Sequence, residues 1–150
     1  MPSPSWVAYG RRTAFIAALA SCGACVDIEG GAIEARWTLR NGQGERLRCD
    51  DPAVAARSVR LRLLPDPAGD DLCATASYCR FACADELGVT PFVVPAGTYA
   101  IGLELLTAEG RALGPSDGVR TPALLLRRVA EGELTSLNVS LVLIEAVTAR

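Results

Sequence analysis

The sequence predicts an all-β fold, a β-sandwich of about seven antiparallel strands. Three observations predict it: short segments that alternate apolar and polar residues, turns rich in Gly, Pro and Asp between them, and no sustained helical period with caps. Half of the 150 residues are hydrophobic, which is enough for one domain with a substantial core. Packing of two β-layers is the simplest way to bury such strands.

Four segments alternate with a period of two and predict half-buried strands. The residues that share one face of each are Ile33, Ala35, Trp37 and Leu39; Val59, Leu61 and Leu63; Tyr99, Ile101, Leu103 and Leu105; and Leu137, Val139, Leu141 and Leu143. Trp37 is expected to anchor the core beside a disulfide.

Shorter segments complete the predicted strands. These are Ser77–Cys83, Phe92–Val94 and a last pair, 123–129 and 134–147, around Glu131-Gly132. The predicted turns are Asn41–Gly44, Pro65–Asp71, Pro95–Gly97 and Ala108–Gly110. Gly, Pro, Asn and Asp are the residues that tight turns favour, which supports these boundaries.

The N-terminus has the layout of a secretory signal. Arg11-Arg12 precedes the apolar segment Ala14–Ala20, and no acidic residue occurs before Asp27. A positive region followed by a short apolar segment and small residues is typical of a cleaved signal peptide. The apolar segment is far shorter than the roughly 20 residues that a transmembrane helix needs. We therefore expect an N-terminal signal helix over 1–21.

The tetrapeptide Leu19-Ala20-Ser21-Cys22 follows directly and resembles the lipobox of bacterial lipoproteins. The resemblance implies that Cys22 is lipidated and becomes the first residue of the mature chain. Several acyl chains would then hold the protein on a membrane, since stable anchoring takes at least two signals. It also implies three parts: a signal peptide over 1–21, a lipidated tether over 22–31 and a β-sandwich domain over 32–150. Gly23 after Cys22, rather than Asp, agrees with sorting to the outer membrane.

A second cleavage site competes with the lipobox. Ala18-Leu19-Ala20 fits the A-x-A pattern of ordinary signal peptidase, with cleavage after Ala20. The product would be soluble and would keep all six Cys residues, an even number that suits a disulfide framework. Lipidation of Cys22 would leave five, so cysteine parity favours the soluble product.

The stretch Val94-Pro95-Ala96-Gly97-Thr98-Tyr99 carries a second resemblance. It is similar to the turn and strand of carboxypeptidase-regulatory-like and transthyretin-like β-sandwich domains. The resemblance implies an Ig-like or prealbumin-like sandwich, in which the turn at Pro95–Gly97 directs Tyr99 inward. It covers about a tenth of the chain and implies a fold, from which no function follows.

Four cysteines in the middle of the chain are disulfide candidates, because an exported protein meets an oxidising environment. We favour Cys49–Cys83, which closes a loop of about 34 residues, together with Cys73–Cys79. Two other pairings stay open: Cys49–Cys73 with Cys79–Cys83, and Cys49–Cys79 with Cys73–Cys83.

The composition argues against catalysis. The chain has no His, and all 15 basic residues are Arg, which excludes His-dependent triads and Lys-based chemistry. No phosphate-binding glycine motif is present. The acidic pairs Asp50-Asp51, Asp70-Asp71 and Asp85-Glu86 lie near turns, where solvated charges are the ordinary outcome. We predict no enzyme, no cofactor and no metal site.

The surface charge bears on the partners. Removal of residues 1–21 takes away two Arg and no acid, so the net charge changes from −2 to −4. Such a chain has no basic footprint for nucleic acid. We therefore expect a non-catalytic binding or structural module, lipid-anchored in the cell envelope with an envelope protein or glycan as partner. The alternative is a soluble periplasmic or secreted module that binds carbohydrate or protein.

Overall fold

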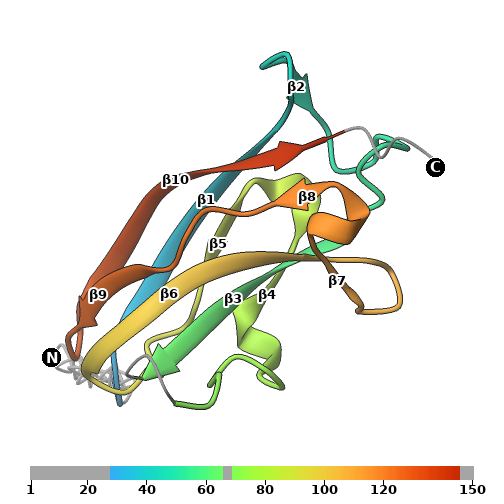
Figure 1. The fold of residues 1–150 in the computed structure, drawn as a ribbon. Helices are drawn as coiled ribbons and strands as arrows, with labels where there is room; N and C mark the ends of the chain where they lie inside the picture. The colour runs from blue at the N-terminus through green and yellow to red at the C-terminus, as the bar shows by residue number, and fades with distance from the viewer. Residues whose placement is uncertain (1–27, 66–68, 146–150) are drawn as a thin grey trace, which may run out of the picture.

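Two β-sheets face each other in the computed structural model, which describes residues 28–65 and 69–145 (Figure 1). Side chains from both sheets meet in a single buried cluster that includes Trp37, Leu61 and Ile101. Within these ranges the only helical elements are three short 3₁₀ turns, η1 Ser77–Cys79, η2 Cys83–Asp85 and η3 Pro115–Asp117. The prediction of an all-β fold is confirmed.

The first sheet is built on two long strands that run parallel to each other, β1 (Ala32–Asn41) and β10 (Leu134–Ile144). Three short strands extend it: β2 (Arg46–Leu47) and β5 (Leu87–Val89) pair with β1, and β8 (Val119–Arg120) pairs with β10. The parallel pair corrects the expectation that all strands are antiparallel. It arises because the first and last long strands of the domain enter the sheet from the same end.

The second sheet is antiparallel throughout its described pairs. Its centre is β3 (Ser58–Pro65) against β6 (Gly97–Leu106). The strands beside them are β4 (Arg80–Ala82), β7 (Ala112–Leu113) and β9 (Leu125–Val129). Residues 28–65 and 69–145 therefore form ten strands, against about seven predicted for the chain, because several two- and three-residue strands are too short to show alternation.

The local alternation predicted the inward residues of three long strands correctly. Along β1, β3 and β6 the predicted apolar rows are buried, each side chain at most 4 % exposed. The turn at Asn41–Gly44 is also present, with Gly44 at a φ of 83° and its N–H bonded to the Asn41 carbonyl at 2.9 Å. Gly is favoured there because this φ is unfavourable for other residues.

Two shorter predicted strands are wrong in extent or in kind. Of Ser77–Cys83 only β4 is a strand, because 3₁₀ turns close on both sides of it. Phe92–Val94 is no strand and makes a single bridge, from Val94 to Gly31. The N–H of Val93 bonds instead to the carbonyl of Pro91 at 2.9 Å, which bends the chain and leaves Phe92 exposed.

The final strand follows its predicted alternation only in its first half. Asn138 has a φ of 58°, and the register with β1 shifts at this point. The extra residue forms a bulge, which reverses the faces of everything after it. Leu137 is buried, whereas Val139, Leu141 and Leu143, which were predicted to share its face, are exposed. The predicted opposite row supplies Val142 and Ile144 to the core.

The core is centred on Trp37, whose side chain is 1 % exposed. Its indole N–H donates to the carbonyl of Cys83 at 2.9 Å, and its ring stacks on Phe81 with 6.3 Å between centroids. Cys83 is bonded to Cys49, and Cys73 to Cys79. These are the two bonds favoured from the sequence, and Trp37 lies beside a disulfide as predicted.

Tyr99 fixes the entry into β6. Its side chain is buried, and its hydroxyl donates to the carbonyl of Pro95 at 2.8 Å. Burial, with a smaller effect from Tyr78, raises the pKa of the Tyr99 hydroxyl above its usual value. The turn before β6 is thereby tied to the strand that follows it.

The bulge predicts a specific mutational response. Asn138→Val should lower the free energy of unfolding by about 1–2 kcal/mol, because a β-branched residue tolerates the left-handed region poorly. Asn138→Gly should leave stability nearly unchanged. Urea unfolding of the oxidised protein followed by Trp fluorescence measures both, and equal stabilities for the two variants would contradict the bulge.

The two disulfides predict unequal losses of stability. Replacing Cys49 and Cys83 by Ser should cost about 3–4 kcal/mol, since the bond joins residues 34 apart. Replacing Cys73 and Cys79 should cost about 2 kcal/mol, because their separation is 6 residues. Urea unfolding gives the energies, and non-reducing peptide mapping checks the pairing; a Cys49–Cys73 or Cys49–Cys79 peptide would contradict it.

Candidate functional site

The predicted lipidation residue, Cys22, lies outside the described residues, as do the tetrapeptide 19–22 and the signal segment. What the structure does describe is the point where the chain enters the domain. Gly30 and Gly31, assigned to the tether from the sequence, are buried against the second half of the domain. A Cβ on Gly30 would lie 2.3 Å from the carbonyl oxygen of Val94, and one on Gly31 would lie 2.4 Å from that of Ala130.

This entry point is at one end of the sandwich. Gly31 donates to the Val94 carbonyl at 2.8 Å, and the carbonyl of Gly30 accepts from Gly132 in the β9–β10 turn at 3.0 Å. Figure 1 shows the start of β1 beside that turn, with the end of β10 at the opposite end of the molecule. No helix among residues 28–65 and 69–145 is long and apolar enough to cross a membrane.

The four domain cysteines are committed to structure. Cys73, Cys79 and Cys83 are at most 1 % exposed, and each is bonded to another cysteine. A disulfide sulfur is neither a thiolate nucleophile nor a metal ligand. Within the described part of the chain, no group of three or more metal-ligating side chains comes together.

The predicted carboxylate pairs lie on separate turns, and four of their members, Asp50, Asp51, Asp71 and Glu86, have local partners. Asp50 forms an ion pair with Arg48 at 3.0 Å on the surface, and this hydrogen bond lowers the pKa of the Asp50 carboxyl. Asp51 caps its own turn by accepting from the Ala53 N–H at 2.9 Å. Glu86 pairs with Arg46 across the edge of the first sheet.

Asp71 has the most elaborate structural role of the acidic residues. One carboxylate oxygen accepts from the N–H of Leu63 at 2.9 Å and from the N–H of Cys73 at 3.0 Å. The other lies 4.0 Å from the guanidinium of Arg62. Asp71 therefore fastens the loop after β3 to the end of that strand, next to a disulfide, and offers no uncommitted general base.

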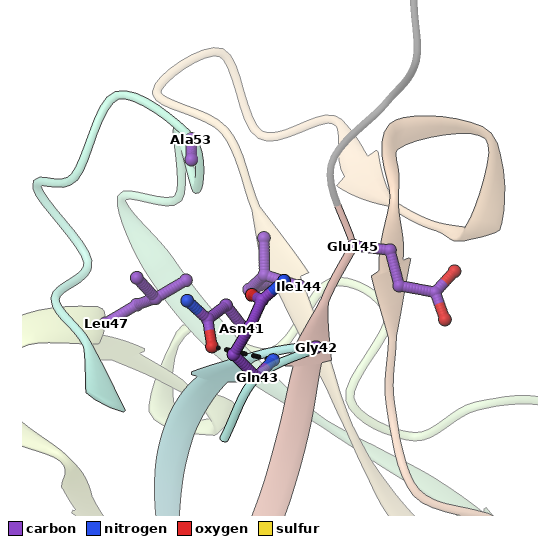
Figure 2. A pocket seen from close by; sticks show the side chains of 7 residues that line it. All are labelled: Asn41, Gly42, Gln43, Leu47, Ala53, Ile144 and Glu145. Carbon is purple, nitrogen blue, oxygen red and sulfur yellow. Dashed lines mark hydrogen bonds between the residues drawn. The ribbon is translucent and has the colours of Figure 1, made fainter. Parts of the chain in front are cut away.

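A cavity of about 490 Å³ lies at the end of the sandwich away from the chain entry. Figure 2 shows its lining: Asn41, Gly42, Gln43, Leu47, Ala53, Ile144 and Glu145. The Asn41 side chain accepts from the backbone of Gln43 at 3.0 Å and donates to Glu45 at 2.7 Å. Glu145 points away from the other lining side chains in Figure 2 and pairs with Arg120 at 3.1 Å. The cavity therefore has a mixed lining, in which Leu47, Ala53 and Ile144 are apolar and the side chains of Asn41 and Glu145 already have partners.

A more distinctive feature is the outward face of the first sheet. Six large hydrophobic side chains are exposed on its strands, namely Leu87, Val89, Leu134, Val139, Leu141 and Leu143. Of the four from β10, Val139, Leu141 and Leu143 line a groove of about 400 Å³, and Leu134 is the first residue of the strand. The sequence did not predict this face, because the bulge at Asn138 turns outward a row that shares a face with the buried Leu137 in the uninterrupted pattern.

Comparison of the chain with protein-family models, with curated proteins and with solved structures gives no match. The features of the domain that bear on its function are therefore the paired cysteines, the carboxylates with local partners, the entry point at Gly30-Gly31 and the exposed apolar face.

The structural role of Asp71 is testable. Asp71→Ala should lower the free energy of unfolding by about 1–3 kcal/mol, because two backbone N–H groups lose their acceptor. Asp71→Asn keeps one side-chain oxygen and should retain most of the stability. Thermal unfolding compares the two, and an Asp71→Ala variant as stable as the parent would contradict the role.

Proposed function

We propose that the chain is a cell-envelope lipoprotein, held on the membrane through Cys22, whose β domain is a non-catalytic binding module. The observation that carries the anchoring is the tetrapeptide Leu19-Ala20-Ser21-Cys22 behind a short apolar segment. The sorting residue Gly23 favours the outer membrane. The partner is a protein or glycan of the envelope.

The described domain supports a binding role in two ways. Its acidic pairs are dispersed over separate turns, and its domain cysteines are bonded to each other. Its first sheet presents large apolar side chains to solvent, and an exposed apolar surface of this kind is typical of interaction sites. The chain entry at Gly30-Gly31 lies near one end of the sandwich, so a membrane tether would leave most of the first sheet accessible.

We infer that the two-sheet domain is an Ig-like or prealbumin-like sandwich. The turn Pro95–Gly97 followed by an inward Tyr99 supports this, as does the bond from the Tyr99 hydroxyl to a backbone carbonyl four residues earlier. A tyrosine that bonds back to the preceding corner is a recurrent device of Ig-like sandwiches.

A soluble product cleaved after Ala20 is the second candidate, and cysteine parity favours it. Because two bonds account for Cys49, Cys73, Cys79 and Cys83, parity now concerns only Cys22 and Cys25. In a soluble product these two have each other as the remaining partner. In a lipoprotein Cys22 is consumed by the lipid.

Intact mass of the protein purified from its native host distinguishes the two candidates. We expect residues 22–150 plus the mass of a diacylglyceryl group and an N-acyl chain. Cys22→Ser should remove the added mass and the membrane association, whereas the matched variant Cys25→Ser should keep both. A mass equal to residues 21–150 without lipid would refute the lipoprotein.

A further inference from the structure

One edge of β10 lacks a strand partner along most of its length. On one side β10 pairs with β1 from Leu134 to Ile144. On the other side β8 reaches only Leu143 and Ile144. Among the described residues, no strand pairs with residues 136–142 on that side. A strand directs half of its backbone N–H and C=O groups to each side, so this edge presents a row of donors and acceptors.

The edge is open because the segment that precedes β10, residues 119–129, is divided between the two sheets. We call this segment the arm. The chain from β8 to β9 runs alongside β10 in Figure 1, but β8 belongs to the first sheet and β9 pairs with β6 in the second. The connecting residues 121–124 cross from one sheet to the other. Pro122 in this connection has no N–H to offer. The arm therefore passes beside β10 without completing the ladder.

A groove of about 400 Å³ occupies the space between β10 and this arm. Its β10 side is formed by Leu137, Val139, Ser140, Leu141 and Leu143, and its other side by Arg120, Thr121, Pro122 and Leu125. Leu137 belongs to the core, so the floor of the groove reaches the space between the sheets. Arg120 is the one charged lining residue described, and Glu145 already pairs with it.

We propose that this groove binds an extended, uncharged and largely apolar peptide segment of a partner protein, which adds to the first sheet as a strand beside β10. The proposal deepens the proposed binding function and rests on it. The free backbone groups of residues 136–142 select a strand, because only an extended backbone satisfies a whole row of them at once. Seven residues span roughly 20 Å at about 3.3 Å each, which sets the segment length at about six or seven residues.

The side chains around the edge define which segment fits. Residues of the added strand alternate between the groove floor, at Leu125 and Leu137, and the outer face, beside Val139 and Leu141. Val139 is 63 % exposed, more than any other large hydrophobic among the described residues. Apolar side chains therefore meet apolar surface on both sides of the strand, whereas a charged one would be desolvated without a partner.

The arm that forms the far wall also decides against a second copy of this chain as the occupant. Any incoming strand must lie between β10 and residues 120–125. A second molecule would bring its own arm in front of its own β10, so the two edges could not approach to the roughly 4.8 Å of strand pairing. A single extended segment needs only the groove itself, between the β8 pairing at Leu143 and the β9–β10 turn.

The test uses the full chain with Cys22→Ser, so that no lipid competes for apolar peptide and the result is independent of anchoring. The probes are capped eight-residue peptides that alternate Thr with Val, Leu or Phe. We expect one of them to shift the backbone NMR signals of residues 136–142 and to slow amide exchange there by about tenfold. The same peptide N-methylated at alternate residues keeps its side chains but cannot pair with the edge, and should not bind.

A matched pair of variants locates the contact. Val139→Lys places a charge at the groove and should weaken binding by at least about tenfold. Leu126→Lys, on β9 in the second sheet and 62 % exposed, is equally drastic and should leave binding unchanged.

Four results would overturn the proposal. They are equal binding of the N-methylated peptide, equal weakening by the two Lys variants, no binding of any probe, and a dimer in sedimentation that Val139→Lys abolishes. The last would assign the edge to a second copy. None of these results bears on the lipid, whose presence the intact mass decides, so failure of the groove and failure of the anchor are distinguishable.

Discussion

The hydrogen bond from the Trp37 indole to the Cys83 carbonyl is the contact on which the two sheets jointly depend. Trp37 belongs to β1 in the first sheet, whereas Cys83 follows β4 in the second and is bonded to Cys49. Phe81 stacks on the indole from β4, and Gly88 lies so close to the Phe81 ring that a Cβ would approach within 2.3 Å. The buried Trp37 ring thus contacts the second sheet beside the Cys49–Cys83 bond. The Phe81 ring stacked on it packs closely against Gly88 in β5.

Features that depend on neighbours in sequence were predictable. The buried rows of β1, β3 and β6 follow a strict period of two, and this period alone is enough to identify the inward face. Features that depend on distant segments were not. The parallel pairing of β1 with β10 joins the two ends of the domain, and β2 and β8 are each two residues long. Their pairing depends on tertiary packing and leaves no periodic signal.

The candidate sites also differ in how far they could be predicted from the sequence. The disulfide pairing could be favoured in advance because it involves few residues and few alternatives, and Cys49 pairs with Cys83 in the structure. The open groove beside β10 could not, because it depends on a bulge and on an arm that changes sheets. Asn138 is the one local clue, since Asn tolerates a positive φ better than most residues. Without the bulge, Val139, Leu141 and Leu143 would lie on the same face as the buried Leu137.

The entry of the chain at Gly31 has a mechanical consequence. A pull on the N-terminal side of the domain reaches β1 first, at Gly31, which is held to Val94 immediately before the strand begins. Because β1 pairs with β10 over its whole length, a pull directed along β1 shears the ladder and loads many hydrogen bonds at once. Peeling would load them one at a time. A load along the first strand is therefore shared by the first and last long strands of the domain.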